Sequence, residues 1–287
     1  MKAEVLPAFA RHHRAVCLAE GLFCSLEKGA RKREKLDVAY RTATGSWRFR
    51  GPDLLGIDDL KHLQAIVALS GREDRKLSAD PKTSAGVALR HGLELSGHAA
   101  NRDAMMFLGS YRQIAAAAGY NPDAGGSFKR TRASLERMTE ITVWVEMASK
   151  TGKGTQRGSY RLISSTFTDE GNGAIAVAVN PDIAAAILGD TPWCRLDMEE
   201  MRQLTSDAAV KLHQQLSAVI DQGKQLKIGM DTLVAYVWPS PAGNAATRKR
   251  KERLRKAIAE IAAGGWVFDA EGDVFTISRP RKKREAA

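Results

Sequence analysis

Cysteine is scarce in this chain, and its few cysteines follow no pairing or metal-binding pattern. Cys17, Cys24 and Cys194 are odd in number and form no CxxC motif, so we expect free thiols in a reducing compartment. His12 and His13 lie near two of them, but the spacing matches no usual set of zinc ligands. We therefore predict no metal site.

Long apolar runs are also missing. No uninterrupted apolar stretch reaches the ~18 residues that a membrane helix needs, and the first residues lack the apolar core of a signal peptide. The sequence therefore predicts a cytoplasmic protein that does not contact a membrane.

The sequence patterns that mark enzymes are absent as well. Gly152 and Lys153 look like the end of a phosphate-binding loop, but GxxxxGK[ST] would need glycine in place of Met147 and serine or threonine in place of Gly154. No GxSxG or HExxH pattern occurs. The two histidines named above are adjacent, whereas metal-dependent nicking enzymes place an apolar residue between theirs. We therefore predict a non-enzymatic protein with no catalytic residues and no cofactor.

What the chain does contain is apolar residues for a core and an excess of positive charge. With 287 residues, 44% hydrophobic and 27% charged, it can bury a real core, and we expect two domains of ordinary size. Lys and Arg number 44 against 33 Asp and Glu, which gives a net charge of +11 and a pI of about 9.7. A basic protein can simply have a solvated surface, so the clustering of the cations decides between this and nucleic-acid binding.

The cations are concentrated near the C-terminus. Seven of the nine residues from Arg248 to Lys256 are Lys or Arg. The apolar residues of this segment recur at i, i+4 and i+7, at Leu254, Ile258 and Ile261. This spacing predicts a helix over 244–263 with one buried face. Because like charges on one surface repel, a polyanion such as nucleic acid would stabilise them. The alternative is a solvated helix with pairs such as Arg248 with Glu252.

Between Gly109 and Ile163 a helix, a turn, a second helix and a hairpin follow one another. YRQIAAAAG predicts a short helix that ends at Gly119. Residues 127–138 predict the second helix, with Ser127 as its cap. The apolar face of this helix would carry Phe128, Leu135 and Met138. ITVWVEM and SYRLI predict the two strands, and the whole order is that of a winged helix.

The same order of elements recurs later in the chain. DTLVAYV, the cationic helix, WVFD and VFTIS predict a helix pair followed by a hairpin. We therefore predict an α+β fold with two tandem winged-helix domains and short β-hairpin wings. The first would span 51–190, and the second would span 191–287 with a basic C-terminal tail. An N-terminal arm over 1–50 would precede them, with a hairpin over 36–50.

A helix of this kind fits the major groove of duplex DNA, where its outward residues reach base edges and flanking cations hold phosphates. We expect Arg248, Lys249 and Glu252 to contact bases, and Arg255 and Lys256 to contact the backbone. A solvated turn is the alternative for the first hairpin tip. The DNA-binding candidates together are Lys129, Arg130, Ala133, Arg137, Lys150, Lys153, Arg157, Thr247, Arg248, Lys249, Arg250, Lys251, Glu252, Arg255, Lys256 and Arg279.

With these residues in view, most of the chain resembles the replication initiator protein C of IncQ-type broad-host-range plasmids. The resemblance is carried by six segments in order, GLFCSLEKGARKREKLDVAY (21–40), GSYR (109–112), AVAVNPDIA (176–184), YVWPS (236–240), RKRKERLRKAI (248–258) and ISRP (277–280). It implies binding to double-stranded origin DNA at direct repeats, called iterons, and opening of a neighbouring AT-rich stretch. It also implies a plasmid helicase and primase as partners, and it leaves open a homodimer off DNA.

Two other functions stay open from the sequence. A transcriptional repressor would use the same DNA chemistry, but normally as a symmetric dimer on a palindrome. Two different winged helices in one chain favour a directly repeated site instead. The enzymatic alternative is a nickase or relaxase that would use His12 and His13 with a tyrosine.

Overall fold

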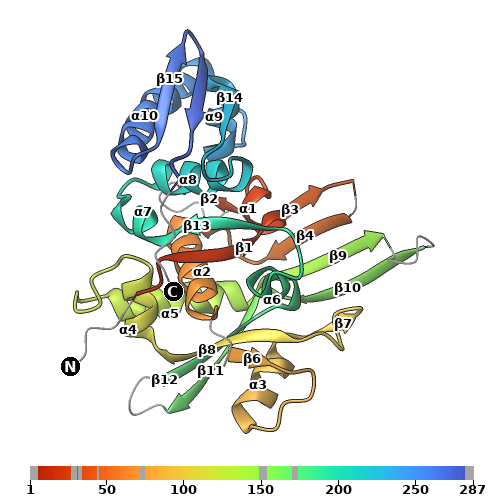
Figure 1. Ribbon diagram of the computed structural model, residues 1–287. Coiled ribbons are helices and arrows are strands. Elements are labelled where there is room, and N and C mark those ends of the chain that lie inside the picture. Colours follow the sequence, from red (N-terminus) through yellow and green to blue (C-terminus); the bar gives the residue numbers. More distant parts are fainter. Residues whose placement is uncertain are drawn as a thin grey trace.

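The computed structural model describes residues 6–26, 31, 34–43, 45–71, 75–148, 154–169 and 174–281. Over these residues helices and strands are mixed along the chain, and the strands form five sheets (Figure 1). The predicted α+β class is therefore confirmed. None of the helices in this part of the chain is long and apolar enough to cross a lipid bilayer.

A five-stranded antiparallel sheet contains both hairpins predicted in the first half. Its strand order is β3–β4–β9–β10–β7. The strands are β3 (Leu36–Arg41), β4 (Gly45–Gly51), β9 (Thr142–Ala148), β10 (Thr155–Arg161) and β7 (Ser96–Gly97). Successive side chains of a strand point to opposite faces. One face of this sheet is therefore buried, through Leu36, Phe49, Val143 and Tyr160, and the other face meets solvent.

The structure corrects the predicted N-terminal arm over 1–50, because residues 36–51 belong to this sheet. Strand β4 pairs with β9 from Gly45 to Arg50. A two-stranded hairpin is marginal in water by itself. Pairing with β9 supplies a third strand and an apolar layer, so these N-terminal residues are part of the first structural unit.

A second sheet contains an almost wholly buried strand. Its order is β11–β12–β8–β6. The strands are β11 (Ile163–Asp169), β12 (Ala174–Val179), β8 (Ala104–Ser110) and β6 (Lys76–Leu77). In β12, with the sequence AIAVAV, five of the six residues are buried. Helices α3 (Ser84–Gly92) and α6 (Pro181–Leu188) pack against this sheet, which explains why β12 has no polar side.

The central helix α2 (Ile57–Leu69) packs against α4 (Tyr111–Ala117) and α5 (Ser127–Thr139). The carboxylate of Asp59, in the first turn of α2, is fully buried and accepts a hydrogen bond from the Gly56 amide at 2.8 Å. The same carboxylate accepts hydrogen bonds from Ser134 Oγ and Arg137 Nη2 of α5, each at 2.7 Å. It also accepts one from Arg31 Nη2 at 2.9 Å. Asp59 thus holds α5 against α2.

Strand β1 (Phe9–His13) joins the start of the chain to its second half, because it pairs with β13 (Trp193–Asp197). Helix α1 (Arg14–Leu18) and the short parallel pair β2 (Phe23–Cys24) and β5 (Leu55–Gly56) lie between β1 and α2 in the sequence. Most buried apolar side chains form one continuous cluster that includes Ala10 and Ile277, and a smaller second cluster lies under α3. The two halves therefore share a hydrophobic core.

The C-terminal unit lies at the top of Figure 1. Its helices are α7 (Met198–Gln203), α8 (Asp207–Val219), α9 (Met230–Val237) and α10 (Asn244–Ala263). Its sheet has the order β14–β16–β15, with β14 (Gln225–Gly229), β16 (Val274–Ser278) and β15 (Val267–Glu271). Helix α8 contacts both α9 and α10, so it forms the base on which the cationic helix rests.

Three local details differ from the sequence-based predictions. The N-cap of α5 is Gly126, not Ser127; its φ of 97° suits glycine, which has no Cβ to clash in the left-handed region. The N-cap of α8, which the sequence TSDAAVKL predicts at Thr205, is Ser206. Phe128, predicted for the core, is 53% exposed, because the helix turns this position away from α2.

We expect Asp59→Asn to destabilise the protein by about 3 kcal/mol, because it leaves two arginines without their shared buried carboxylate. Urea unfolding followed by circular dichroism would measure the change. The matched control is Glu136→Gln on α5, since Glu136 pairs with Arg132 on the exposed surface and such pairs contribute about 0–1 kcal/mol. Equal effects of the two substitutions would contradict a dominant role for Asp59.

Candidate nucleic-acid interface

Helix α10 forms where the sequence predicts it, and its apolar stripe faces the core. Pro239 and Pro241 separate it from α9, since proline cannot continue a helix. The side chains it buries are Leu254, Ala257, Ile258 and Ile261. All of them lie in its C-terminal half, so the apolar attachment of α10 to the core is confined to that half.

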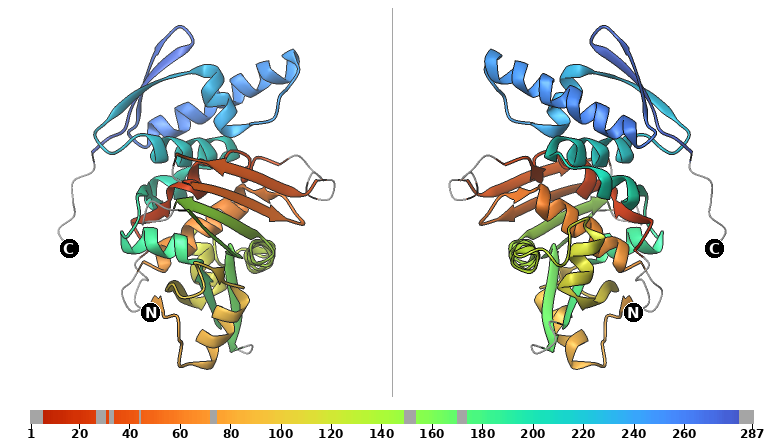
Figure 2. Two further views of the ribbon diagram at one scale, coloured as in Figure 1. Left: turned by 90° about the vertical axis from the view of Figure 1, so that its right-hand side faces the viewer. Right: turned by 90° about the vertical axis from the view of Figure 1, so that its left-hand side faces the viewer.

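The N-terminal half of α10 projects from the protein. No residue from 244 to 253 is buried, and both views of Figure 2 show this end pointing away from the rest of the chain. At 1.5 Å per residue, these ten residues extend roughly 15 Å. A free helix end of this length can enter a groove.

The projecting helix carries several cations without a counter-charge. Arg248, Lys249, Arg253 and Arg255 are exposed, and within the described parts of the chain none of them has a carboxylate within ion-pair distance. The alternative pair of Arg248 with Glu252 does not form. Glu252 instead bonds Lys256 at 2.9 Å, one turn later, so its carboxylate is partly neutralised.

The other candidate residues of α10 make contacts within the protein. Lys251 Nζ reaches Asp231 of α9 at 2.7 Å. Arg250 donates to the Ser240 carbonyl at 2.5 Å, and Thr247 Oγ1 donates to the Ala242 carbonyl at 3.2 Å. In the sequence, Arg250 and Lys251 lie within the cationic run and Thr247 lies next to it. In the structure these three side chains orient the helix, whereas the neighbouring cations make no ion pair among the described residues. We assign the polyanion-facing role to the unpaired cations.

Glu260 fixes the attached half of α10 to the start of α8. Its carboxylate accepts hydrogen bonds from Ser206 Oγ at 2.6 Å and Thr205 Oγ1 at 2.9 Å, and from the backbone amides of both residues. Burial works to raise the pKa of Glu260, but these hydrogen bonds stabilise the carboxylate and lower the pKa overall. The carboxylate also satisfies amides that the start of α8 leaves without a helical partner.

Arg279 is a DNA-binding candidate from the sequence, but in the structure it is buried and cannot contact DNA from this position. Its guanidinium donates to the carbonyls of Ser217 and Ile220 at 3.0 Å and of Arg195 at 2.6 Å. It also lies 5.3 Å from the ring centre of Trp266. Burial lowers the pKa of Arg279. This arginine fastens the end of β16 to the C-terminus of α8.

The helix pair α4 and α5, which the sequence predicts as the first helix-turn-helix, presents fewer cations. Lys129 and Arg130 are exposed and Ala133 is half-buried. The Arg130 guanidinium lies 4.9 Å from the ring centre of Tyr120. The sequence predicts that Arg137 points outward, and the structure corrects this, because the buried carboxylate of Asp59 holds it inward (2.7 Å).

The predicted wing is the β9–β10 hairpin. Arg157 is exposed and pairs with Glu146 across the hairpin at 2.7 Å, so its charge is partly neutralised. Lys150 and Lys153 lie outside the described residues, as does the basic tail beyond residue 281. The tip of the second hairpin is acidic and exposed, with Asp269, Glu271 and Asp273.

Sequence reasoning missed two residues of this interface. Arg253 was not among the candidates, although it lies inside the cationic run and is exposed and unpaired. The run itself was the signal that could have included it. Glu260 gave no signal, because its partners Thr205 and Ser206 are distant in the sequence.

Comparison with known structures shows the same α+β fold elsewhere. The chain is similar to a crystal structure of selenomethionine derivatives of domains 2 and 3 of RctB, with 13% identity, a TM-score of 0.55, and coverage of 90% of this chain and 95% of that one. A second crystal structure of RctB domains 2–3 is similar at 11% identity, with a TM-score of 0.51 and coverage of 87% and 94%.

The family model described as Replication protein C (RepC) matches residues 6–281. The chain therefore belongs to the replication protein C family, a family of plasmid replication initiators. No curated protein sequence matches it.

Acid should weaken the attachment of α5, because His62 of α2 is buried at the α2–α5 contact. Its Nε2 lies 3.1 Å from Thr131 Oγ1, and burial lowers its pKa to about 4. The unfolded chain therefore binds more protons than the folded one between about pH 6.5 and 4. We expect the contribution of His62 to the free energy of unfolding to be complete above about pH 6.5. The free energy of unfolding should then fall as the pH drops through this window.

Urea unfolding at several pH values would measure this dependence. His62→Gln should make it shallower without abolishing it, because burial also lowers the pKa values of His12 and His13. His91→Gln, at an exposed position, should leave it unchanged. A pH profile that is the same in His62→Gln and in the natural sequence would show that His62 is not its source.

Proposed function

We propose that this protein initiates plasmid replication by binding directly repeated duplex DNA at the origin, without catalysing a reaction. The observation that carries the proposal is α10, whose N-terminal half projects from the protein and whose Arg248, Lys249, Arg253 and Arg255 are exposed and without an ion-pair partner among the described residues. Like charges held this close repel one another, so a polyanion that neutralises them gains free energy on binding. Because the chain belongs to the replication protein C family, we propose that this polyanion is origin DNA.

In this proposal the N-terminal half of α10 lies in the major groove, which is wide enough to admit a helix. Arg248 and Lys249, nearest the free end, would donate to guanine O6 and N7. Arg253 and Arg255, nearer the core, would hold phosphates, because cations beside a groove-bound helix meet the DNA backbone. Glu252 is the candidate acceptor for cytosine N4, although its bond to Lys256 competes with that role.

We further propose that two winged helices act in tandem. The first is α4, α5 and the β9–β10 hairpin, and the second is α9, α10 and the β15–β16 hairpin. Lys129 and Arg130 are exposed on α5. The third exposed cation, Arg132, is paired with Glu136, so α5 would contribute less charge than α10. Two unlike modules in one chain fit an asymmetric, directly repeated site better than a palindrome.

The resemblance to the IncQ-type initiator adds finer steps to the proposal. After the repeats are bound, a neighbouring AT-rich stretch would open, and a plasmid helicase and primase would be loaded there. The protein would form a homodimer off DNA. A nicking role is disfavoured because His12 and His13 are 0% and 8% exposed, so neither presents its ring to a DNA strand.

The decisive experiment is a footprint on DNA that flanks the gene. We expect protection of several repeats with the same polarity at each, as an initiator requires. A footprint with two-fold symmetry would support a repressor instead. A covalent protein–DNA adduct, formed with divalent metal and supercoiled origin DNA, would support a nickase and overturn the proposal.

Arg248→Ala and Lys249→Ala should each weaken binding to the repeat by about 1–3 kcal/mol if the residue contacts a base. An equal loss on random DNA would mark a phosphate contact, and the log–log salt dependence would then become shallower by about 0.9 for each phosphate that is no longer neutralised. Fluorescence anisotropy at several salt concentrations would measure both. The charge-matched control is Lys82→Ala, a surface lysine that is 82% exposed and lies in a loop far from α10 in the sequence. If Lys82→Ala weakens binding as much as either, α10 is not the interface.

A further inference from the structure

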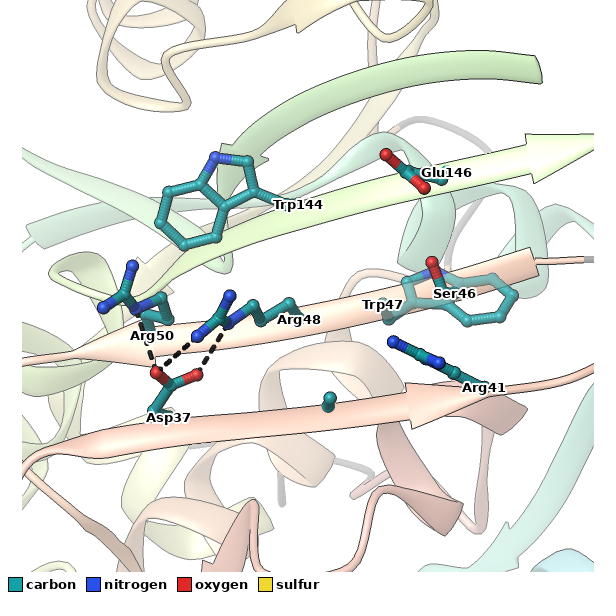
Figure 3. A pocket seen from close by; sticks show the side chains of 9 residues that line it. Asp37, Arg41, Ser46, Trp47, Arg48, Arg50, Trp144 and Glu146 are labelled. Atoms are coloured by element: carbon teal, nitrogen blue, oxygen red, sulfur yellow. Dashed lines mark hydrogen bonds and ion pairs between the residues drawn. The ribbon is translucent and has the colours of Figure 1, made fainter.

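The solvent face of the five-stranded sheet carries an aromatic and basic surface that α10 does not explain. An open depression of about 730 Å³ lies on β3, β4 and β9, and Figure 3 shows it from close by. We name this surface the sheet face and define it by Asp37, Arg41, Arg48, Arg50, Trp144 and Glu146.

Trp144 is the first unusual feature of the sheet face. Its neighbours Val143 and Val145 are both 1% exposed and belong to the core, whereas Trp144, between them on β9, is 42% exposed. The other four tryptophans of the chain are buried or half-buried. Alternation along the strand puts Trp144 on the solvent side, so this large ring contributes little to the core and leaves a π-face open.

Two arginines lie beside this ring, and a third, Arg41, lies on β3 opposite Ser46 (Figure 3). Arg48 is the direct cross-strand partner of Trp144, and the Arg50 guanidinium lies 5.9 Å from the ring centre. Arg41 is exposed and has no partner within the described residues. Cations beside an aromatic ring interact favourably with it, and they also place positive charge next to any group that stacks there.

The acidic residues of the sheet face neutralise only part of this charge. Asp37 accepts from Arg48 at 2.8 Å and lies 3.2 Å from Arg50, so one carboxylate serves two guanidinium groups. Glu146 is paired with Arg157 on β10. The three arginines on β3 and β4 therefore exceed the single acid beside them, and the sheet face favours an anionic ligand.

The geometry distinguishes between kinds of nucleic acid. A duplex keeps its base faces within its own stack, so a protein reads it with a protruding element in a groove. The sheet face has no protruding helix; it offers a ring surface and neighbouring cations. Single strands bind through base stacking on aromatic side chains and phosphate contacts to cations.

We propose that the sheet face binds single-stranded DNA, with an unpaired base stacked on Trp144 and flanking phosphates held by Arg41, Arg48 and Arg50. The choice of DNA over RNA rests on the proposed function, since an opened origin exposes a DNA strand. One protein would then bind duplex repeats through α10 and the separated strand through the sheet face.

The test compares two variants on two probes, a labelled oligothymidine of about 12 nucleotides and a duplex repeat. Trp144→Ala should weaken binding of the single strand by about tenfold or more, because stacking contributes strongly per base, and it should leave duplex binding unchanged. Trp144→Phe should retain most of the single-strand affinity. The double substitution Arg248→Ala and Lys249→Ala should have the opposite pattern and weaken only duplex binding.

Several outcomes separate this inference from the proposed function. If single-strand affinity is unchanged in Trp144→Ala, or falls only in the α10 variant, the inference fails while the duplex-binding proposal stands. A preference for oligouridine over oligothymidine would assign the sheet face to RNA and also overturn it. The urea unfolding midpoint of Trp144→Ala, expected to match the natural sequence because the ring is exposed, shows that a loss of binding is not a loss of fold.

Discussion

The buried carboxylate of Asp59 is the interaction on which the first half of the structure depends. It closes the first turn of α2 and receives two side chains from α5 and one from Arg31. A carboxylate removed from water is costly unless it is paired and hydrogen-bonded. The orientation of α5 on α2 is thus set by one buried carboxylate as well as by apolar packing.

The C-terminal unit uses the reverse arrangement. There the charges lie on the surface. The hydrogen bonds of Glu260 and the buried apolar side chains of α10 hold the C-terminal half of this helix. Its N-terminal half makes few contacts with the protein. The two devices have different consequences. The α4–α5 pair uses Arg137 to stabilise the fold, whereas four cations of α10 have no ion-pair partner among the described residues. The largest cluster of unpaired cations described above therefore lies on α10.

The sequence predicts the local elements well, because helix and strand periods are local properties. The spacing of Leu254, Ile258 and Ile261 is enough to predict α10 and its orientation. Pairing between distant segments leaves no such trace, which is why the sequence predicts the hairpin over 36–50 but assigns it to a separate arm, whereas its strand β4 pairs with β9. Arg137 resembles any surface arginine until its buried partner is known. The exposed Trp144 could have been found from its alternation with Val143 and Val145.

The ladder between β1 and β13 has a consequence for how the protein is made. His12 and Cys194, opposite one another in that ladder, are 182 residues apart in the chain. At ribosomal speeds of about 5–20 residues per second, β1 waits roughly 10–40 s for its partner. During this interval the backbone N–H and C=O groups at its edge are unpaired and open to other nascent chains, so a chaperone that shields the emerging N-terminal segment would raise the yield of folded protein.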